Sequence, residues 1–158
     1  MSMRPQASWG TILRALLLGH VAAVAGFCGA ICTLWLLTST NLWTLQPGAF
    51  VDFAKAAAGL TILTFFFMIP VSIVHAPFVI LAVVWLRGSA IVAGSVGALV
   101  GAGENFAILA SSGDFSGQWS RIGDPGDPRT GGAIMLCGAV AGIAYALVLW
   151  RLCIQRYR

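Results

Sequence analysis

The chain has 158 residues, of which 59% are hydrophobic and only 9% are charged. Soluble domains carry about 25% charged residues, so this composition excludes an ordinary water-soluble protein and predicts an integral membrane protein. The net charge of +4 does not indicate nucleic-acid binding, because the basic residues lie near the ends of apolar segments and form no basic stripe.

The pattern of apolar segments predicts an all-α protein, an integral membrane four-helix bundle. The expected spans are residues 12–37, 54–86, 89–110 and 131–152. Each reaches the length of roughly 20 residues that a helix needs to cross a bilayer. We expect a single transmembrane domain, residues 1–158, without a soluble catalytic or nucleotide-binding module. No catalytic motif is recognisable, so we expect no enzyme activity.

The first apolar segment, Ala15–Leu37, follows Arg14. It contains the small-residue triplet Ala23–Ala25, which invites comparison with a signal peptide. The apolar core of a signal peptide has about 7–15 residues, whereas apolar sequence here continues well beyond the triplet. A retained helix is therefore preferred. The polar residues and the Pro47-Gly48 turn signal within Thr38–Phe53 predict a loop after it.

The second apolar segment, Ala56–Leu86, is long and is interrupted by Pro70 and Pro77. As one helix it would extend about 46 Å, which exceeds the roughly 30 Å of the hydrocarbon core. One interpretation is a single long span, tilted or kinked at the prolines. The other is a hairpin that turns near His75–Pro77. The part after Pro77 is too short to cross alone, so the single kinked span is preferred.

Small residues recur at four-residue spacing in three of the four segments. Helices in lipid associate by close packing rather than by the hydrophobic effect, and small residues allow their backbones to approach. The spacing therefore predicts tightly packed helices. It leaves open whether the partners lie in this chain or in another copy. The residues are Ala22, Gly26 and Ala30, then Ala93, Gly97 and Gly101, and finally Gly138 and Gly142.

The placement of charge predicts that both termini are cytoplasmic, in the plasma (inner) membrane. In that topology six arginines and no acidic residue lie inside, whereas three basic and four acidic residues lie outside, as the positive-inside rule expects. The inner residues are Arg4, Arg14, Arg87, Arg151, Arg156 and Arg158; the outer ones are Lys55, Arg121, Arg129, Asp52, Asp114, Asp124 and Asp127.

Glu104 is the only acidic residue inside an apolar segment, and Asn105 follows it. Helical periodicity places Glu104 on the same face as Gly97 and Gly101, so its carboxylate points toward a neighbouring helix. A charge at membrane depth costs several kcal/mol unless it is paired or protonated, which makes Glu104 and Asn105 candidates for contact with an ion, a proton or a substrate. The preferred interpretation is nevertheless a structural carboxylate near the external boundary, and the hypothesis for its partner is Lys55.

His20 and His75 are the only histidines and are also candidates. A haem held between them is one hypothesis. It is disfavoured because the two residues are expected at different depths. The preferred hypothesis is that each is hydrogen-bonded across helices or to a carbonyl freed by a proline. No metal or cofactor is expected.

The four cysteines are expected to be free thiols, because none lies in a likely external loop. They are Cys28, Cys32, Cys137 and Cys153. Cys28 and Cys32 share a helix face but lack further nearby ligands for a metal. The acidic residues of the 111–130 loop lack the ligand spacing of a calcium site, and aspartate before glycine or proline is ordinary in turns.

Two functions remain open from the sequence. The first, which is preferred because Glu104 is the only acidic residue inside an apolar segment, is a non-enzymatic accessory or structural subunit. It would pack in the lipid bilayer through its small-residue faces, against itself as a homo-oligomer or within a larger membrane complex. The second is a small oligomeric transporter or channel that uses Glu104 and the proline-broken second helix. Broken helices are frequent at transport sites. A lipid-binding role is also compatible with the sequence.

Overall fold

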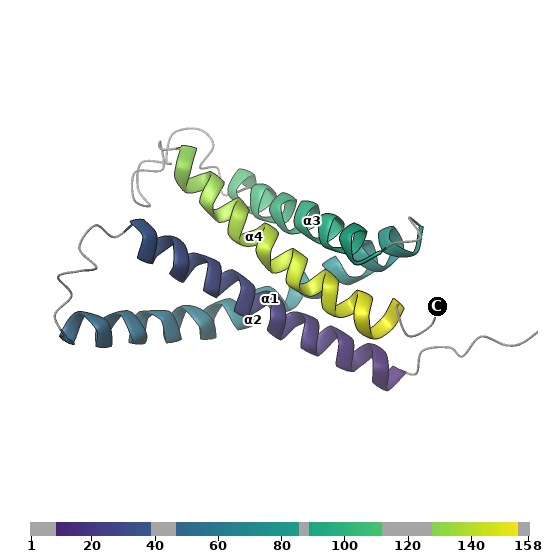
Figure 1. Cartoon of the computed structure of the whole chain (residues 1–158), viewed down its shortest axis with the longest axis horizontal. Coiled ribbons are helices and arrows are strands. Elements are labelled where there is room, and N and C mark those ends of the chain that lie inside the picture. Colours follow the sequence, from purple (N-terminus) through teal and green to yellow (C-terminus); the bar gives the residue numbers. More distant parts are fainter. Residues whose placement is uncertain (1–8, 39–46, 86–88, 112–127, 155–158) are drawn as a thin grey trace, which may run out of the picture.

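A computed structural model of the chain describes residues 9–38, 47–85, 89–111 and 128–154. Throughout these ranges the fold is helical, with α1 at Trp9–Thr38, α2 at Pro47–Trp85, α3 at Ala90–Ser111 and α4 at Pro128–Leu149 (Figure 1). A π-helical turn, Trp150–Ile154, continues α4. All four helices contain an apolar stretch long enough to cross a membrane. This confirms the prediction of an all-helical chain with four candidate membrane spans.

Successive helices run in alternating directions, so α1 begins and α4 ends at the same end of the molecule (Figure 1). α4 lies between α1 and α3 and makes its most extensive contacts with these two helices. Its buried side chains include Tyr145 and Leu149, which join a core with alanines of α1 and α3. The four cysteines are free, as predicted.

α2 is one continuous helix of 39 residues with Pro70 and Pro77 inside it, so the hairpin interpretation is wrong. The helix begins at Pro47, which also corrects the prediction of a loop extending to Phe53. The Pro47-Gly48 pair suggested a turn. Proline is equally favoured in the first turn of a helix, where its missing N–H needs no partner. The alanines that follow are strong helix formers.

Glycines bring the backbones of α3 and α4 into direct contact. A Cβ atom placed on Gly97 would overlap the carbonyl oxygen of Gly142, and one on Gly101 would overlap that of Gly138. The predicted small-residue faces of the third and fourth segments therefore meet within this chain. On α1, a Cβ atom on Gly26 would lie 3.4–3.5 Å from backbone and side-chain atoms of α4, which is an ordinary contact.

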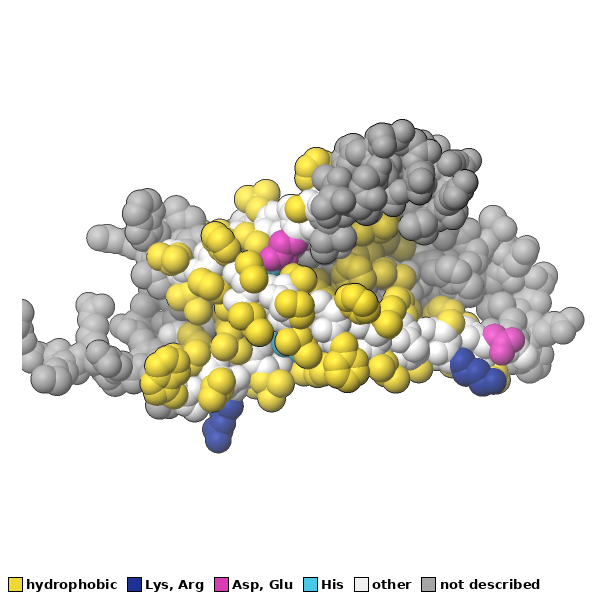
Figure 2. All heavy atoms as spheres, turned by 180° about the vertical axis from the view of Figure 1, so that it is seen from behind, with side chains coloured by type: hydrophobic (Ala, Val, Ile, Leu, Met, Phe, Trp, Pro, Cys, Tyr) yellow, Lys and Arg dark blue, Asp and Glu magenta, His cyan; other side chains and the backbone are white. Residues whose placement is uncertain are grey.

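Many large apolar side chains of the described helices are exposed, and hydrophobic side chains are spread over the described face that Figure 2 shows. α2 contributes the largest share of the exposed apolar residues. This is the surface that lipid would cover in a membrane protein, whereas soluble proteins rarely expose so large an apolar patch. On α2 the exposed residues include Ile62, Leu63, Phe66, Phe67, Ile73, Val74, Phe78 and Leu81.

Candidate functional site

A histidine and a carboxylate meet between α2 and α3. The Nδ1 atom of His75 lies 2.9 Å from Oε2 of Glu104, and the two side chains are 5% and 24% exposed. The helical periodicity of α3 correctly indicated that the carboxylate faces a neighbouring helix. The imidazole and the carboxylate can share one proton, and this keeps the pair electrically neutral as a unit.

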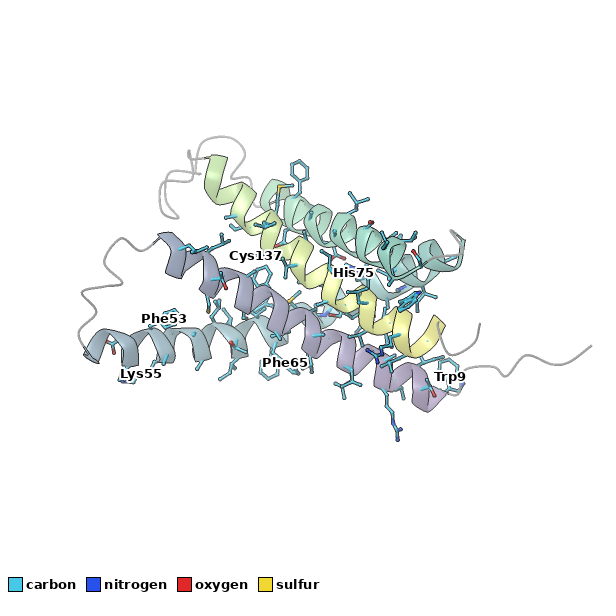
Figure 3. The ribbon with its side chains drawn as sticks, viewed as in Figure 1. Trp9, Phe53, Lys55, Phe65, His75 and Cys137 are labelled. Carbon is cyan, nitrogen blue, oxygen red and sulfur yellow. The ribbon has the colours of Figure 1, made fainter. Side chains whose placement is uncertain are left out.

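The prediction that Glu104 pairs with Lys55 is wrong, because its carboxylate contacts His75 instead. Lys55 is exposed and precedes His75 by 20 residues on α2, a distance of about 30 Å along the helix. Figure 3 shows the two labelled residues far apart on α2. The error lies in the offset of α2 along α3 and not in the predicted position of Glu104 on its own helix. Within α3 it lies 14 residues from Ala90, about 21 Å along a helix of 22 residues.

Tyr145 of α4 connects this pair to the rest of the core. Its ring packs edge-on against His75, with the ring centroids 5.2 Å apart. Its hydroxyl donates a 2.8 Å hydrogen bond to the carbonyl oxygen of Ser72 on α2. The sequence reasoning did not identify Tyr145 or Ser72. The available signal was the tyrosine hydroxyl within an apolar segment, because a buried hydroxyl needs a hydrogen-bond partner.

His20 of α1 binds the same stretch of α2. Its Nε2 lies 3.0 Å from the carbonyl oxygen of Phe65, and its Nδ1 lies 2.8 Å from Oγ of Ser72. A carbonyl can only accept, so Nε2 carries a proton and donates. Both ring nitrogens are therefore engaged, and they do not fit an axial haem ligand. His20 has the structural role that the sequence favoured, a hydrogen bond across helices.

The backbone carbonyls that accept from His20 and from Tyr145 occupy equivalent positions relative to the two prolines of α2. Phe65 lies five residues before Pro70, and Ser72 lies five residues before Pro77. Each proline removes one backbone donor from the helix and crowds the carbonyl of the preceding turn. Donors from α1 and α4 thus reach the helix backbone next to each proline. A proline leaves the carbonyl four residues before it without its usual donor, here that of Phe66 or Ile73. The two bonds therefore reach the carbonyl next to the freed one in each case.

Asn105, beside the pair in sequence, is tied to the contact between α3 and α4. Its Nδ2 donates a 2.9 Å hydrogen bond to the carbonyl oxygen of Gly101 within its own helix. A Cβ atom on Gly138 would overlap this amide, so Asn105 occupies the space that the glycine leaves. The amide therefore lies at the boundary between helix packing and the His75–Glu104 pair.

A cavity of about 250 Å³ adjoins the pair and receives residues from all four described helices. Three of the four predicted candidates, His75, Glu104 and Asn105, line it, whereas His20 lines a second cavity of about 300 Å³ between α1 and α2. Among the described residues, no lysine or arginine lines the first cavity. Its walls are Ala23, Phe27, Leu63, Thr64, Phe67, Met68, Val71, Ser72, His75, Gly101, Glu104, Asn105, Gly138, Ala141, Gly142 and Tyr145.

One nitrogen of this site has no hydrogen-bond partner. The Nε2 atom of His75 is buried, and no acceptor or donor reaches it in the described part of the chain. Leaving a buried polar atom unpaired costs roughly 1–3 kcal/mol, so such atoms mark positions where a proton, a water or a ligand is expected. Among the described residues no group of three potential ligands is arranged to hold a metal ion.

Comparisons of the chain with protein families, with curated proteins and with solved structures give no match. A functional assignment therefore depends on the helices and on the geometry of this site. The features that bear on it are the buried His75–Glu104 pair, the cavity beside it and the prolines of the helix that carries His75.

Proposed function

We propose that this chain is a small multi-pass membrane transporter that binds and releases a proton at the His75–Glu104 pair. The observation that carries the proposal is a buried histidine–carboxylate pair, 2.9 Å apart, in the wall of a cavity between apolar helices. Ionisable residues within membrane spans are rare, and they are typical of ion pathways and proton relays. The unpaired Nε2 atom of His75 supports the same role.

The chemistry of the pair fits reversible proton binding. With one shared proton the pair is neutral overall, which is the state that a low-dielectric environment favours. Adding or removing a proton creates a net charge that a cavity ligand or a change in exposure must compensate. A carrier needs this coupling between protonation and the state of its binding site.

We propose that α2 is the moving element and that it is kinked at Pro70 and Pro77. Proline removes a hydrogen bond from the helix interior, and helices broken in this way form the binding sites of many transporters. The bonds from His20 and Tyr145 to α2 support this view, because they hold the backbone of α2 on the two sides of Pro70. α2 carries His75, so its movement would change the access of the pair to either side of the membrane.

We further propose that both termini are cytoplasmic in a bacterial-type inner membrane, with the protein acting as a homo-oligomer. The arginine distribution supports this orientation, and the alternating helices place the start of α1 and the end of α4 at one end. The exposed apolar face of α2 supports association with a second copy, since four helices enclose little volume.

An accessory subunit without enzyme activity is the second candidate. The polar contacts favour it, because His20, Tyr145 and Glu104 each bind α2 and so join all four helices. Polar side chains that link helices in this way contribute to stability in membranes. In that case α2 would contact a larger membrane complex through its apolar face.

Proton flux into proteoliposomes separates the two candidates. Purified protein is reconstituted with a trapped pH-sensitive dye, and the rate of acidification is measured after an external pH drop. Under the transport proposal, wild-type protein accelerates acidification and Glu104→Gln returns the rate to that of protein-free liposomes. Asp52→Asn, the same acid-to-amide change at an exposed position on α2, leaves the rate at the wild-type level. Equal rates for Glu104→Gln and wild type would contradict the proposal.

A further inference from the structure

The cavity beside the His75–Glu104 pair has walls whose charge and polarity indicate the class of ligand that it binds. Resting on the proposed function, we infer that the cavity binds a small hydrophobic organic cation, such as an aromatic or aliphatic amine in its charged form, against the carboxylate of Glu104. Cation and proton then compete for the same carboxylate.

The charge of the walls selects a cation over an anion. Within the part of the chain that the structure describes, Glu104 supplies the one carboxylate of the cavity lining, and neither lysine nor arginine contributes to it. An anion would have only His75 as a charged partner, and it would lie beside a carboxylate. A cation instead replaces the proton of the pair and leaves the site neutral, which limits the cost of charge in the membrane.

Most of the other described wall residues are apolar or aromatic. Phe27 of α1, Phe67 and Met68 of α2 and the ring of Tyr145 of α4 line the cavity together with the carboxylate. Aromatic faces attract organic cations through their quadrupole, most strongly where water is excluded. A ligand with an apolar body and one positive charge therefore matches both parts of the cavity.

An inorganic cation fits this cavity less well. Sodium, like other hard metal ions, takes a shell of several oxygen ligands, whereas much of the described lining is hydrocarbon and glycine. The described residues also hold no cluster of three or more potential metal ligands. The cavity of about 250 Å³ lies below the roughly 300–1,000 Å³ of drug-sized pockets, so the expected cation is small.

Binding exchanges one proton for one cation. In the resting site the pair shares a single proton. The incoming cation takes its place beside the Glu104 carboxylate, His75 stays neutral, and the displaced proton passes to bulk water. No covalent bond other than that to the transferred proton changes. Charge is conserved, because one positive charge enters the site and one leaves.

The other buried titratable groups of α1 and α4 do not supply this proton. On α1, His20 donates from Nε2 to the carbonyl of Phe65, and Cys28 is a buried thiol. On α4, the Tyr145 hydroxyl donates to Ser72, and Cys137 is buried. Glu104 is the remaining acid that touches the cavity, so the exchange is assigned to it and to His75.

Equilibrium binding in mild detergent tests the inference with benzyltrimethylammonium as the probe. We expect saturable binding to the full-length protein, with one proton released per cation bound into a weakly buffered solution. One-for-one exchange means that, where the site is protonated, apparent affinity falls about tenfold for each unit decrease in pH. Benzenesulfonate, an anion of similar size, does not bind, and sodium chloride in the same range does not displace the probe.

The binding experiment uses the same two variants as the flux experiment, Glu104→Gln and its control Asp52→Asn. Glu104→Gln removes saturable binding, whereas Asp52→Asn binds like wild type. Binding that survives Glu104→Gln, binding of benzenesulfonate, or the absence of proton release would each overturn the inference. The last two results come from wild-type protein, so they remain decisive if Glu104→Gln does not fold.

The two experiments distinguish a failure of the transport proposal from a failure of the proposed cation binding. Proton flux that depends on Glu104, without binding of the probe, overturns the ligand class and leaves the transport function intact. Proton release on binding the probe, without any proton flux in liposomes that hold the probe on one side of the membrane, supports the site and overturns transport.

Discussion

The hydroxyl of Tyr145 on α4 donates a 2.8 Å hydrogen bond to the backbone carbonyl of Ser72 on α2. This contact joins the helix at the centre of the core to a helix that is mostly exposed on its other faces. A second link between α2 and the core, the His75–Glu104 pair, lies directly beside it, because the ring of Tyr145 packs against His75.

We therefore expect Tyr145→Phe to weaken the attachment of α2 while keeping the ring contact with His75. Hydrogen bonds between membrane helices contribute about 0.6 kcal/mol on average and up to about 1.7 kcal/mol, which is the expected loss in free energy of unfolding. Thermal unfolding in detergent measures it. Thr33→Val is the control, because the exposed Thr33 hydroxyl bonds only its own helix, at Gly29. An equal effect of both substitutions would contradict the proposed role of Tyr145.

The glycine contact between α3 and α4 predicts that alanine substitutions at Gly101 and Gly103 of α3 differ sharply in their effect on the free energy of unfolding. Gly101→Ala places a methyl group against the backbone of Gly138, so we expect a loss of 1–3 kcal/mol or more, as for other overpacked sites. Gly103→Ala meets nothing within 4 Å and is expected to be neutral or slightly stabilising, since alanine is the better helix former. Unfolding midpoints of the two variants check this. Similar midpoints would show that α3 and α4 pack through another face.

The interaction between His75 and Glu104 is testable by a double-mutant cycle with His75→Gln, Glu104→Gln and the combined variant. Groups in direct contact typically show a coupling energy of about 0.5–3 kcal/mol, whereas distant groups are additive. We expect coupling in that range for this pair in urea unfolding. The cycle of Glu104→Gln with Lys55→Met serves as the control and is expected to be additive. Additivity in the first cycle would mean that the 2.9 Å contact has no energetic role.

The proposed orientation predicts which sites a membrane-impermeant maleimide can reach. In a variant without the four native cysteines, Asp124→Cys is labelled from outside intact cells, whereas Ser2→Cys is labelled only after the membrane is permeabilised. Both positions lie outside the described residues, so the prediction rests on the arginine distribution alone. Labelling of Ser2→Cys in intact cells would contradict the proposed cytoplasmic position of the N-terminus.

The sequence was sufficient to predict the helices and one packing face. Apolar length predicted four membrane-type helices, and the four-residue spacing of glycines predicted the face on which α3 meets α4. The same periodicity predicted that Glu104 points toward a neighbour. Each of these properties depends on local spacing within one helix, which the order of residues determines directly.

The partner of Glu104 was not predictable in the same way. Choosing between His75 and Lys55 requires the offset of α2 relative to α3 along the membrane normal. That offset depends on where α2 begins, and the Pro47-Gly48 pair was interpreted as a turn rather than as a helix start. Tyr145 and Ser72 were missed for a related reason. Their bond joins residues 73 positions apart, and no local pattern indicates it.

The length of α2 has a consequence for the bilayer around it. Its apolar stretch, Val51–Leu81, has 31 residues, about 46 Å as a helix, against a hydrocarbon thickness of roughly 30 Å. A straight helix of that length would need an inclination beyond the roughly 0–40° seen for membrane helices. Thicker membranes relieve this hydrophobic mismatch and thinner ones increase it. The lipid composition of the host membrane therefore acts directly on the inclination of the helix that carries His75.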